Sequence, residues 1–150
     1  MNENKKKINA SILIIGNEIL SGRTQDLNIL FLSNWLNKEC GIAVREVRVI
    51  PDVKKIIIKN VIDLSKKFKY VFTTGGIGPT HDDITAKSIS EAFKVRYEFH
   101  KEAYSILEKY YGKKNFNEGR KKMAKMPRTS LLIYNPSSAA PGFKIKNVFC

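Results

Sequence analysis

The stretch YVFTTGGIGPTHDDIT (70–85) decides how the rest of the sequence is interpreted. An apolar run typical of a buried strand leads into a loop with three glycines in four positions, and two adjacent aspartates follow. Glycine lets the backbone approach another group closely because it has no Cβ. Adjacent carboxylates repel each other, so their position after a strand indicates a loop that is built around a ligand.

Apolar periodicity places this loop in an alternation of strands and helices. β-Branched or alternating runs predict strands over 8–15, 42–50 and 69–74. Helical spacing predicts helices over 24–41, 52–67 and 83–93, and in the first of these Leu27, Phe31 and Trp35 recur at i, i+4 and i+8. Residues 98–126 have a polar helical pattern, and 130–134 and 144–150 resemble two further strands.

This order predicts an α/β fold of one domain over 1–150, a three-layer sandwich whose mostly parallel sheet has helices on both faces. The sequence stops inside the last expected strand, so we expect the natural chain to continue past Cys150.

Composition narrows the class of protein. The net charge of +13 is spread evenly along the chain and attracts anions, although lysines on solvated helix faces account for most of it. No nucleic-acid-binding motif accompanies the charge, so we expect a phosphorylated small molecule as partner and no specific nucleic acid. No apolar run approaches a membrane span and the N-terminus lacks a cleavage site, which predicts a cytoplasmic protein without a membrane partner. Cys40 and Cys150 indicate neither a disulfide nor a zinc site.

Polar residues follow several of the expected strands. In an open parallel sheet the strands end on one edge, and ligands bind in the crevice outside their carboxyl ends. The residues that we expect to converge there are Gly16, Asn17 and Glu18 after the first strand, Asp52 after the second, Thr74, Gly75, Gly76, Gly78, Pro79, Thr80, His81, Asp82 and Asp83 after the third, and Asn135, Ser137, Ser138 and Gly142 after 130–134.

The glycines and the carboxylates of this set suggest different roles. Backbone N–H groups of the loop before a helix can hold a phosphate, although the loop matches neither a Walker A motif nor G-x-G-x-x-G and a tight turn also explains it. Carboxylates beside a phosphate require a cation, so Glu18, Asp52, Asp82 and Asp83 are candidate ligands of Mg²⁺ or another divalent metal. Asp52 and one of the paired aspartates can instead cap helices, and His81 can be a surface turn residue.

Four segments together resemble a known family: GNEILSGRTQDLN (16–28), VIPD (49–52), TTGGIGPTHDDIT (73–85) and NPSSAAPGF (135–143). They resemble the molybdopterin-binding domain of molybdenum-cofactor biosynthesis proteins such as MogA. The likeness is closest to the version at the N-terminus of competence/damage-inducible protein CinA and in FAD synthases. One departure is Ser138–Ala139, which stands where the common bacterial pattern has Gly-Thr, so the shape of the ligand's far end is left open.

The resemblance implies a ligand and a chemistry. The crevice would bind molybdopterin, as a pterin phosphate, or an adenine nucleotide, and the loop of Gly75, Gly76, Gly78 and Thr80 would hold its phosphate. Asp52 and Asp83 match the family's catalytic aspartates, and Glu18 matches the acidic residue of the first loop. The implied reaction is Mg²⁺-dependent nucleotidyl transfer or pyrophosphate hydrolysis; the alternative is a regulatory module that binds without turnover. We also expect a homo-oligomer, a dimer or a trimer.

Overall fold

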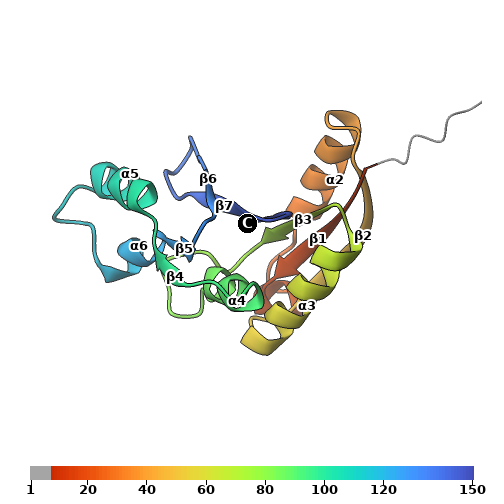
Figure 1. Ribbon diagram of the computed structural model, residues 1–150, viewed down its shortest axis with the longest axis horizontal. Helices are drawn as coiled ribbons and strands as arrows, with labels where there is room; N and C mark the ends of the chain where they lie inside the picture. Colours follow the sequence, from red (N-terminus) through yellow and green to blue (C-terminus); the bar gives the residue numbers. More distant parts are fainter. Residues whose placement is uncertain (1–7) are drawn as a thin grey trace, which may run out of the picture.

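The computed structural model describes residues 8–150, which form a six-stranded sheet with helices and a smaller lobe beside it (Figure 1). Along the chain the elements are β1 (Asn9–Ile15), α1 (Asn17–Leu20), α2 (Asn28–Lys38), β2 (Ala43–Ile50), α3 (Lys54–Lys67), β3 (Tyr70–Thr74), α4 (Thr85–Ala92), β4 (Tyr97–Phe99), α5 (Lys101–Tyr111), α6 (Glu118–Lys122), β5 (Lys125–Pro127), β6 (Leu131–Ile133), β7 (Gly142–Ile145) and β8 (Val148–Phe149).

The sheet has the strand order β2-β1-β3-β8-β7-β6. β2, β1, β3 and β8 are parallel neighbours, whereas β7 runs antiparallel to both β8 and β6. β1 lies between two parallel strands and is covered on both faces, which explains its nearly uninterrupted apolar sequence. Because two antiparallel pairings separate β6 from β8, β6 runs in the same direction as β3. Its carboxyl end therefore reaches the same edge of the sheet.

Helices cover both faces of the parallel half of the sheet, as Figure 1 shows. α3 and α4 lie on one face, where Ile57, Val61 and Leu64 of α3 and Ile89 of α4 form one core with inward residues of β1, β3, β7 and β8. α2 lies on the opposite face, over β1 and β2. The small lobe contains α5, α6 and the antiparallel pair β4–β5. The predicted three-layer α/β fold with a mostly parallel sheet is thus confirmed.

The segment predicted as one helix over 24–41 differs from that prediction. A four-residue helix, α1, precedes it, and α2 itself begins only at Asn28. The stripe of Leu27, Phe31 and Trp35 faces solvent, with exposed fractions of 67%, 66% and 48%. The side of α2 that meets the sheet instead carries Leu32 and the buried Leu36. α2 is apolar on two faces, so periodicity alone did not identify the inward one.

Two predictions for the second half of the chain were also incomplete. Residues 98–126 hold the strands β4 and β5 in addition to two helices. The single strand predicted over 144–150 is a hairpin in which Ile145 pairs with Val148 around the turn Lys146–Asn147. Lys146 has a φ of 50°, a conformation that is uncommon for lysine. The sequence therefore did not predict a turn at this position.

Candidate functional site

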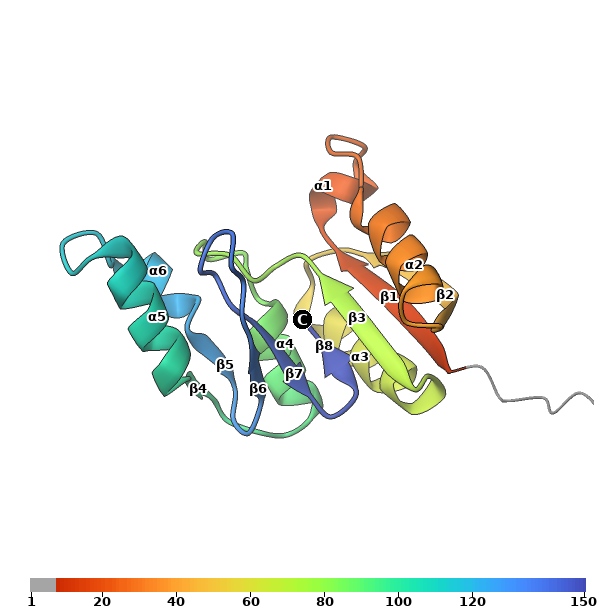
Figure 2. The ribbon, with the colours of Figure 1, turned by 90° about the horizontal axis from the view of Figure 1, so that it is seen from above.

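Three loops meet at the edge where β1, β2 and β3 end, and they form an open cleft of about 380 Å³. Figure 2 shows α1, the loop after β3 and the loop between β6 and β7 along this edge. The side chains or backbone that line the cleft belong to Ile15, Asn17, Glu18, Arg23, Asp52, Gly76, Thr80, His81, Asp82, Asp83 and Ile84. The common edge of the parallel strands therefore brings together residues that are up to about seventy positions apart in the sequence.

Asp52 is held at the cleft by the loop that follows β1. Its Oδ2 accepts a hydrogen bond of 2.8 Å from the backbone N–H of Asn17, and its own N–H faces Asn17 Oδ1 at 3.4 Å. α3 begins two residues later with Val53 as its N-cap, and no side chain caps it. The helix-cap alternative for Asp52 is therefore not what the structure contains.

Asp83 closes a turn inside the glycine loop. Its Oδ2 accepts hydrogen bonds from the backbone N–H of Thr80, at 2.8 Å, and from the Thr80 hydroxyl, at 2.7 Å. α4 starts at Thr85 without a side-chain cap, so Asp83 does not cap it either. Among residues 8–150, the Oδ1 atoms of Asp52 and Asp83 accept no hydrogen bond. Each carboxylate thus has one fixed oxygen and one free oxygen.

The glycines make the loop compact. Gly75 and Gly76 have φ values of 92° and 68°, in the left-handed region that favours glycine. A Cβ on Gly75 would collide with the carbonyl of Ile15, and one on Gly76 with the hydroxyl of Thr85. That hydroxyl holds the loop by donating to the Gly75 carbonyl at 2.9 Å. Within the described residues, the N–H groups of Gly76, Ile77 and Gly78 have no acceptor and remain available to an anion.

Glu18 and Asp82 lie farther from this centre. The Glu18 carboxylate folds back over Gly16, where a Cβ would come within 2.7 Å of its Oε1, so Gly16 makes room for it. Glu18 also lies in the first turn of α1, a short helix that the sequence pattern did not predict. Asp82 pairs with His81 at 2.8 Å, and both side chains are largely exposed. Thr74 and Pro79 contribute backbone to the loop and do not line the cleft.

The fourth predicted segment, 135–143, reaches the same edge, but the hydrogen bonds of its polar side chains lie within the segment. Asn135 donates to the Ser138 hydroxyl at 2.9 Å and accepts from the N–H of Ser137 at 3.0 Å. None of Asn135, Ser137, Ser138 or Gly142 lines the cleft. Their assignment as ligand-binding residues stays a prediction.

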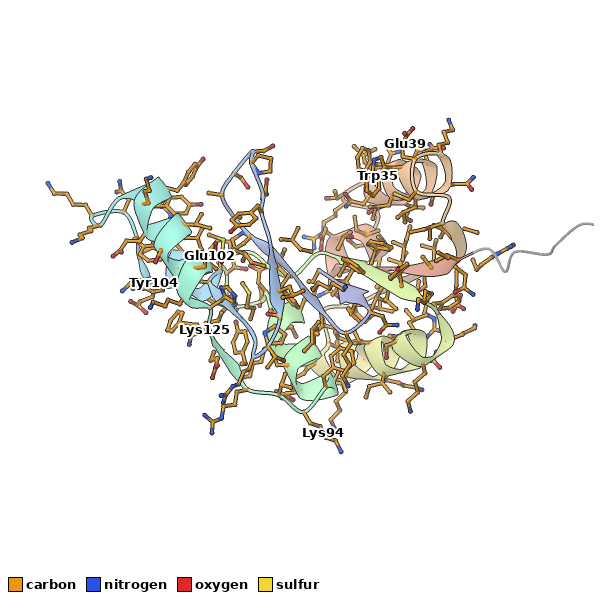
Figure 3. All side chains as sticks on the ribbon, turned by 45° about the horizontal axis from the view of Figure 1, so that its top comes forward. Trp35, Glu39, Lys94, Glu102, Tyr104 and Lys125 are labelled. Atoms are coloured by element: carbon orange, nitrogen blue, oxygen red, sulfur yellow. The ribbon has the colours of Figure 1, made fainter. Side chains whose placement is uncertain are left out.

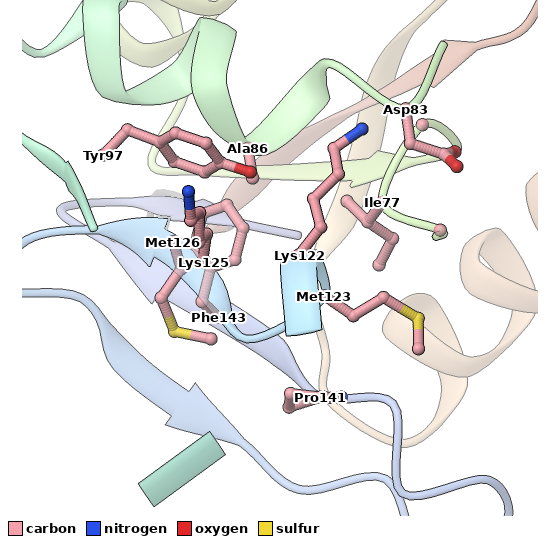
Figure 4. A pocket seen from close by; sticks show the side chains of 12 residues that line it. Ile77, Asp83, Ala86, Tyr97, Lys122, Met123, Lys125, Met126, Pro141 and Phe143 are labelled. Atoms are coloured by element: carbon pink, nitrogen blue, oxygen red, sulfur yellow. The ribbon is translucent and has the colours of Figure 1, made fainter. Parts of the chain in front are cut away.

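The structure places two cationic side chains at the site that the sequence did not predict there. Arg23 lies in the quoted first segment and lines the cleft. Lys122 comes from α6 in the small lobe, and its ammonium donates to the carbonyl of Thr80. Figure 4 shows Lys122 and Asp83 at a narrow cavity behind the loop, with Ile77 between them. No sequence signal connects Lys122 with a loop more than forty residues earlier, because only the tertiary fold brings them together.

The carboxylates do not form a complete metal cage. No group of three His, Cys, Asp or Glu side chains within residues 8–150 is arranged to hold a metal ion. Mg²⁺, however, is commonly bound by one or two carboxylates together with water and phosphate oxygens. The free oxygens of Asp52 and Asp83, beside a glycine loop with open N–H groups, fit that kind of site.

The chain belongs to the family described as "Probable molybdopterin binding domain", whose model it matches over residues 11–150. Among solved structures, it is similar to the protein CinA, of unknown function, from Thermoplasma acidophilum. The TM-score is 0.86 with 32% identity over 94% of this chain and 85% of the other. This match confirms the predicted CinA-like form of the domain. The tungsten cofactor synthesizing protein MoaB from Pyrococcus furiosus shares the fold, with a TM-score of 0.54 and 19% identity over 96% of this chain and 81% of the other.

Longer relatives are also similar in sequence. A protein from Archaeoglobus fulgidus is 38% identical over 137 residues, which are 91% of this chain and 58% of the relative. A protein from Sulfurisphaera tokodaii is 36% identical over 139 residues, or 91% of this chain and 52% of the relative. The chain thus spans about half the length of the curated relatives it matches. No helix within residues 8–150 has the length and apolar character needed to cross a membrane.

Proposed function

We propose that the cleft binds a pterin phosphate or an adenine nucleotide and acts on its phosphoanhydride with a divalent metal. The observation that carries this proposal is that Asp52 and Asp83 line the same cleft. Each carboxylate is fixed through Oδ2 by a backbone N–H and leaves Oδ1 free at the glycine loop. Carboxylates that share a cleft with a bound anion are electrostatically unfavourable unless a cation lies between them and the anion.

Each group has a distinct part in this proposal. The N–H groups of Gly76, Ile77 and Gly78 hold the phosphate, while Arg23 contributes positive charge at the cleft. Asp52 and Asp83 would hold Mg²⁺. When bound, the metal supplies charge neutralisation and polarises a phosphoryl oxygen. Glu18 and Asp82 also line the cleft, where their carboxylates would add negative charge beside the metal.

The experiment compares ligand binding with turnover. Thermal shift with ADP, ADP-ribose and a pterin phosphate, each with and without Mg²⁺, measures binding, and release of AMP from ADP-ribose measures turnover. Asp52→Asn and Asp83→Asn keep an oxygen acceptor for the N–H of Asn17 or Thr80, so the loops stay in place. Each variant should lose turnover by at least about 10²-fold, and the double variant should lose little more, because residues acting as a unit are not additive.

A matched control separates this effect from a general loss of acidic charge. Asp63→Asn removes a carboxylate of α3 that pairs with Arg48 away from the cleft, and it should leave turnover and Mg²⁺ dependence unchanged. Near-wild-type turnover in either single cleft variant would show that Asp52 and Asp83 do not act together on the ligand.

A second candidate function is a binding module without turnover. The absence of a three-ligand metal cluster within the described residues favours it. This candidate predicts a thermal shift with a phosphorylated ligand, no product from any of the three compounds, and retained binding in Asp83→Asn.

A further inference from the structure

The helix α6 of the small lobe contacts the glycine loop at two neighbouring residues. The ammonium of Lys122 donates a hydrogen bond to the Thr80 carbonyl. Gly119 comes so close to the loop that a Cβ on it would lie 2.8 Å from the carbonyl oxygen of Pro79. Figure 4 shows the Lys122 side chain beside Ile77, on the side of the cavity where Asp83 lies. The small lobe is therefore joined to the loop that forms one wall of the cleft.

The Thr80 carbonyl belongs to a closed turn that includes Asp83. The backbone N–H of Asp83 donates to this carbonyl at 3.3 Å, in addition to Lys122. In the other direction, the N–H and the hydroxyl of Thr80 donate to Asp83 Oδ2 at 2.8 and 2.7 Å. Because both residues are donor and acceptor to each other, the position of Thr80 determines which way the Asp83 carboxylate points.

From these contacts we propose that Lys122 is a positioning residue of the cleft. By fixing the Thr80 carbonyl from outside the loop, Lys122 holds Asp83 in the orientation that leaves Oδ1 free. Lys122 acts through Thr80 and is not itself a ligand of the phosphate or the metal. This inference rests on the proposed function, because only that function gives the free oxygen of Asp83 a task.

The hydrogen bond of Lys122 differs from that of the lysine beside it. Lys121 pairs with Glu118 at 2.6 Å, inside the small lobe. Lys122 is half-buried and takes part in no ion pair among residues 8–150, so the Thr80 carbonyl does not compete with a carboxylate for its ammonium. Hydrogen bonds in which the donor is charged are stronger than neutral ones. Lys122 is thus suited to hold the loop, whereas Lys121 is not.

Aromatic contacts fix α6 within the small lobe, so Lys122 extends from an anchored helix. The buried Phe116, just before α6, packs edge-on against Tyr104 of α5, with 4.9 Å between the ring centroids. Figure 3 shows Tyr104 on α5 in this lobe. On the other side, the Arg120 guanidinium lies 4.3 Å from the ring centroid of Tyr111, at the end of α5. α5 and α6 therefore form one support for the glycine loop.

Amide exchange in the ligand-free chain, measured by NMR, tests whether Lys122 holds the turn. Lys122→Met keeps the aliphatic stem and removes the donor. The hydrogen-bonded N–H groups of Thr80 and Asp83 should then exchange at least about 10-fold faster, which is the lower end of the effect of a hydrogen bond to a charged group. Lys121→Met is the matched control and should leave both rates unchanged. Lys122→Arg retains a charged donor and should restore slow exchange.

Binding of inorganic pyrophosphate, measured by titration calorimetry with and without Mg²⁺, tests whether the turn serves the cleft. Lys122→Met should weaken the Mg²⁺-dependent binding about 10-fold and have little further effect in an Asp83→Asn background, because a residue that acts through Asp83 is coupled to it. A mere loss of positive charge would weaken binding equally with and without Mg²⁺ and equally in both backgrounds.

Three results would overturn the proposal. The first is unchanged exchange at Thr80 and Asp83 in Lys122→Met. The second is an equal loss of pyrophosphate binding from Lys122→Met in the wild-type and Asp83→Asn backgrounds. The third is a wild-type chain that binds no pyrophosphate under either condition, which would overturn the proposed function and with it the task of Lys122. This third result differs from the second, in which the wild type binds and only the coupling is missing.

Discussion

At the scale of single residues, Gly76 meets two separate requirements. Its φ of 68° is a conformation that L-residues adopt only at a cost, and a Cβ would also strike the Thr85 hydroxyl. Gly41 meets only the first requirement, because its φ is 64° and nothing lies within 4 Å of the position of a Cβ. Substitutions at the two glycines therefore distinguish the cost of backbone strain, present at both, from the cost of a steric clash, present only at Gly76.

We predict that Gly41→Ala lowers the free energy of unfolding by about 1 kcal/mol, the usual cost of a left-handed conformation for alanine. Gly76→Ala should cost more than that, because the loop must also shift away from Thr85. Chemical denaturation of the two variants measures the difference. Equal losses would mean that Thr85 moves aside freely and that the loop is not tightly packed.

The sequence predicted the position of some of the cleft residues and not of others. The glycines, Asp52 and Asp83 were predicted to meet because each follows a strand of a parallel sheet, and topology alone then fixes their common edge. Arg23 and Lys122 were not predicted, because a cation on a loop or a short helix has the same sequence appearance whether it faces solvent or a cleft. The hydrogen bonds that turn Asp52 and Asp83 away from their helices depend on the folded loops and have no sequence signal.

At the scale of elements, an ionic network fastens the edge strand β2 to α3. Glu46 of β2 pairs with Arg48 at 2.6 Å and with Lys67 of α3 at 2.5 Å. Arg48 also reaches Asp63 of α3 at 2.5 Å. The hydrogen bond from Lys67, and then that from Arg48, lowers the pKa of Glu46 below its ordinary value of 4.5.

A lowered pKa of an acid in the folded state has a definite consequence for stability. Glu46 contributes stability above the pKa that it has in the unfolded chain, and this contribution is lost as pH falls through the lower folded pKa. We therefore predict that the melting temperature of the wild type decreases when the pH is lowered below about 4.5. The Glu46→Gln variant should show a smaller decrease in melting temperature over the same pH range. Thermal melts from pH 7 to pH 3 measure this.

Glu98→Gln is the control for that measurement. Glu98 lies 3.8 Å from Arg128, in a looser and more exposed pair, so its replacement should leave the pH profile of the wild type unchanged. Parallel profiles for wild type and Glu46→Gln would mean that the network does not contribute to the acid sensitivity.

Elements differ in how well the sequence predicts them. The strands β1, β2 and β3 were predicted from continuous β-branched runs or from apolar alternation, and β1, which is covered on both faces, has the longest apolar run. β4 and β5 have three residues each, too few for an alternating pattern to be recognised. α2 was predicted as a helix, but the face that packs on the sheet was not identified. The face with Leu32 and Leu36 and the face with Phe31 and Trp35 are both apolar, so periodicity does not distinguish them.

At the scale of the whole molecule, Asn147 connects the turn between β7 and β8 to the C-terminal end of α3. Its side-chain amide donates to the carbonyls of Ser65 and Phe68, both at 2.9 Å. Both carbonyls belong to the C-terminal end of α3, where helix acceptors lack partners. A single side chain thus satisfies two backbone groups and fixes the position of the hairpin.

We predict that Asn147→Ala lowers the free energy of unfolding by about 1–3 kcal/mol, because two partly buried carbonyls lose their donor. Asn37→Ala, at an exposed position of α2 without a side-chain hydrogen bond in the described chain, should change stability little. Chemical denaturation compares the two variants. A loss for Asn147→Ala no larger than that for Asn37→Ala would show that water replaces the amide without cost.

β8 joins the two halves of the sheet, and it pairs with β3 only through Val148 and Phe149. Among the strands of residues 8–150, β8 is the last to be translated. During synthesis, β1, β2 and β3 can assemble once Thr74 has emerged, whereas β3 keeps a bare edge until β8 arrives. A nascent chain therefore carries an open β-edge for the time needed to translate more than seventy further codons, and this interval is the period in which newly made copies are most exposed to pairing with one another.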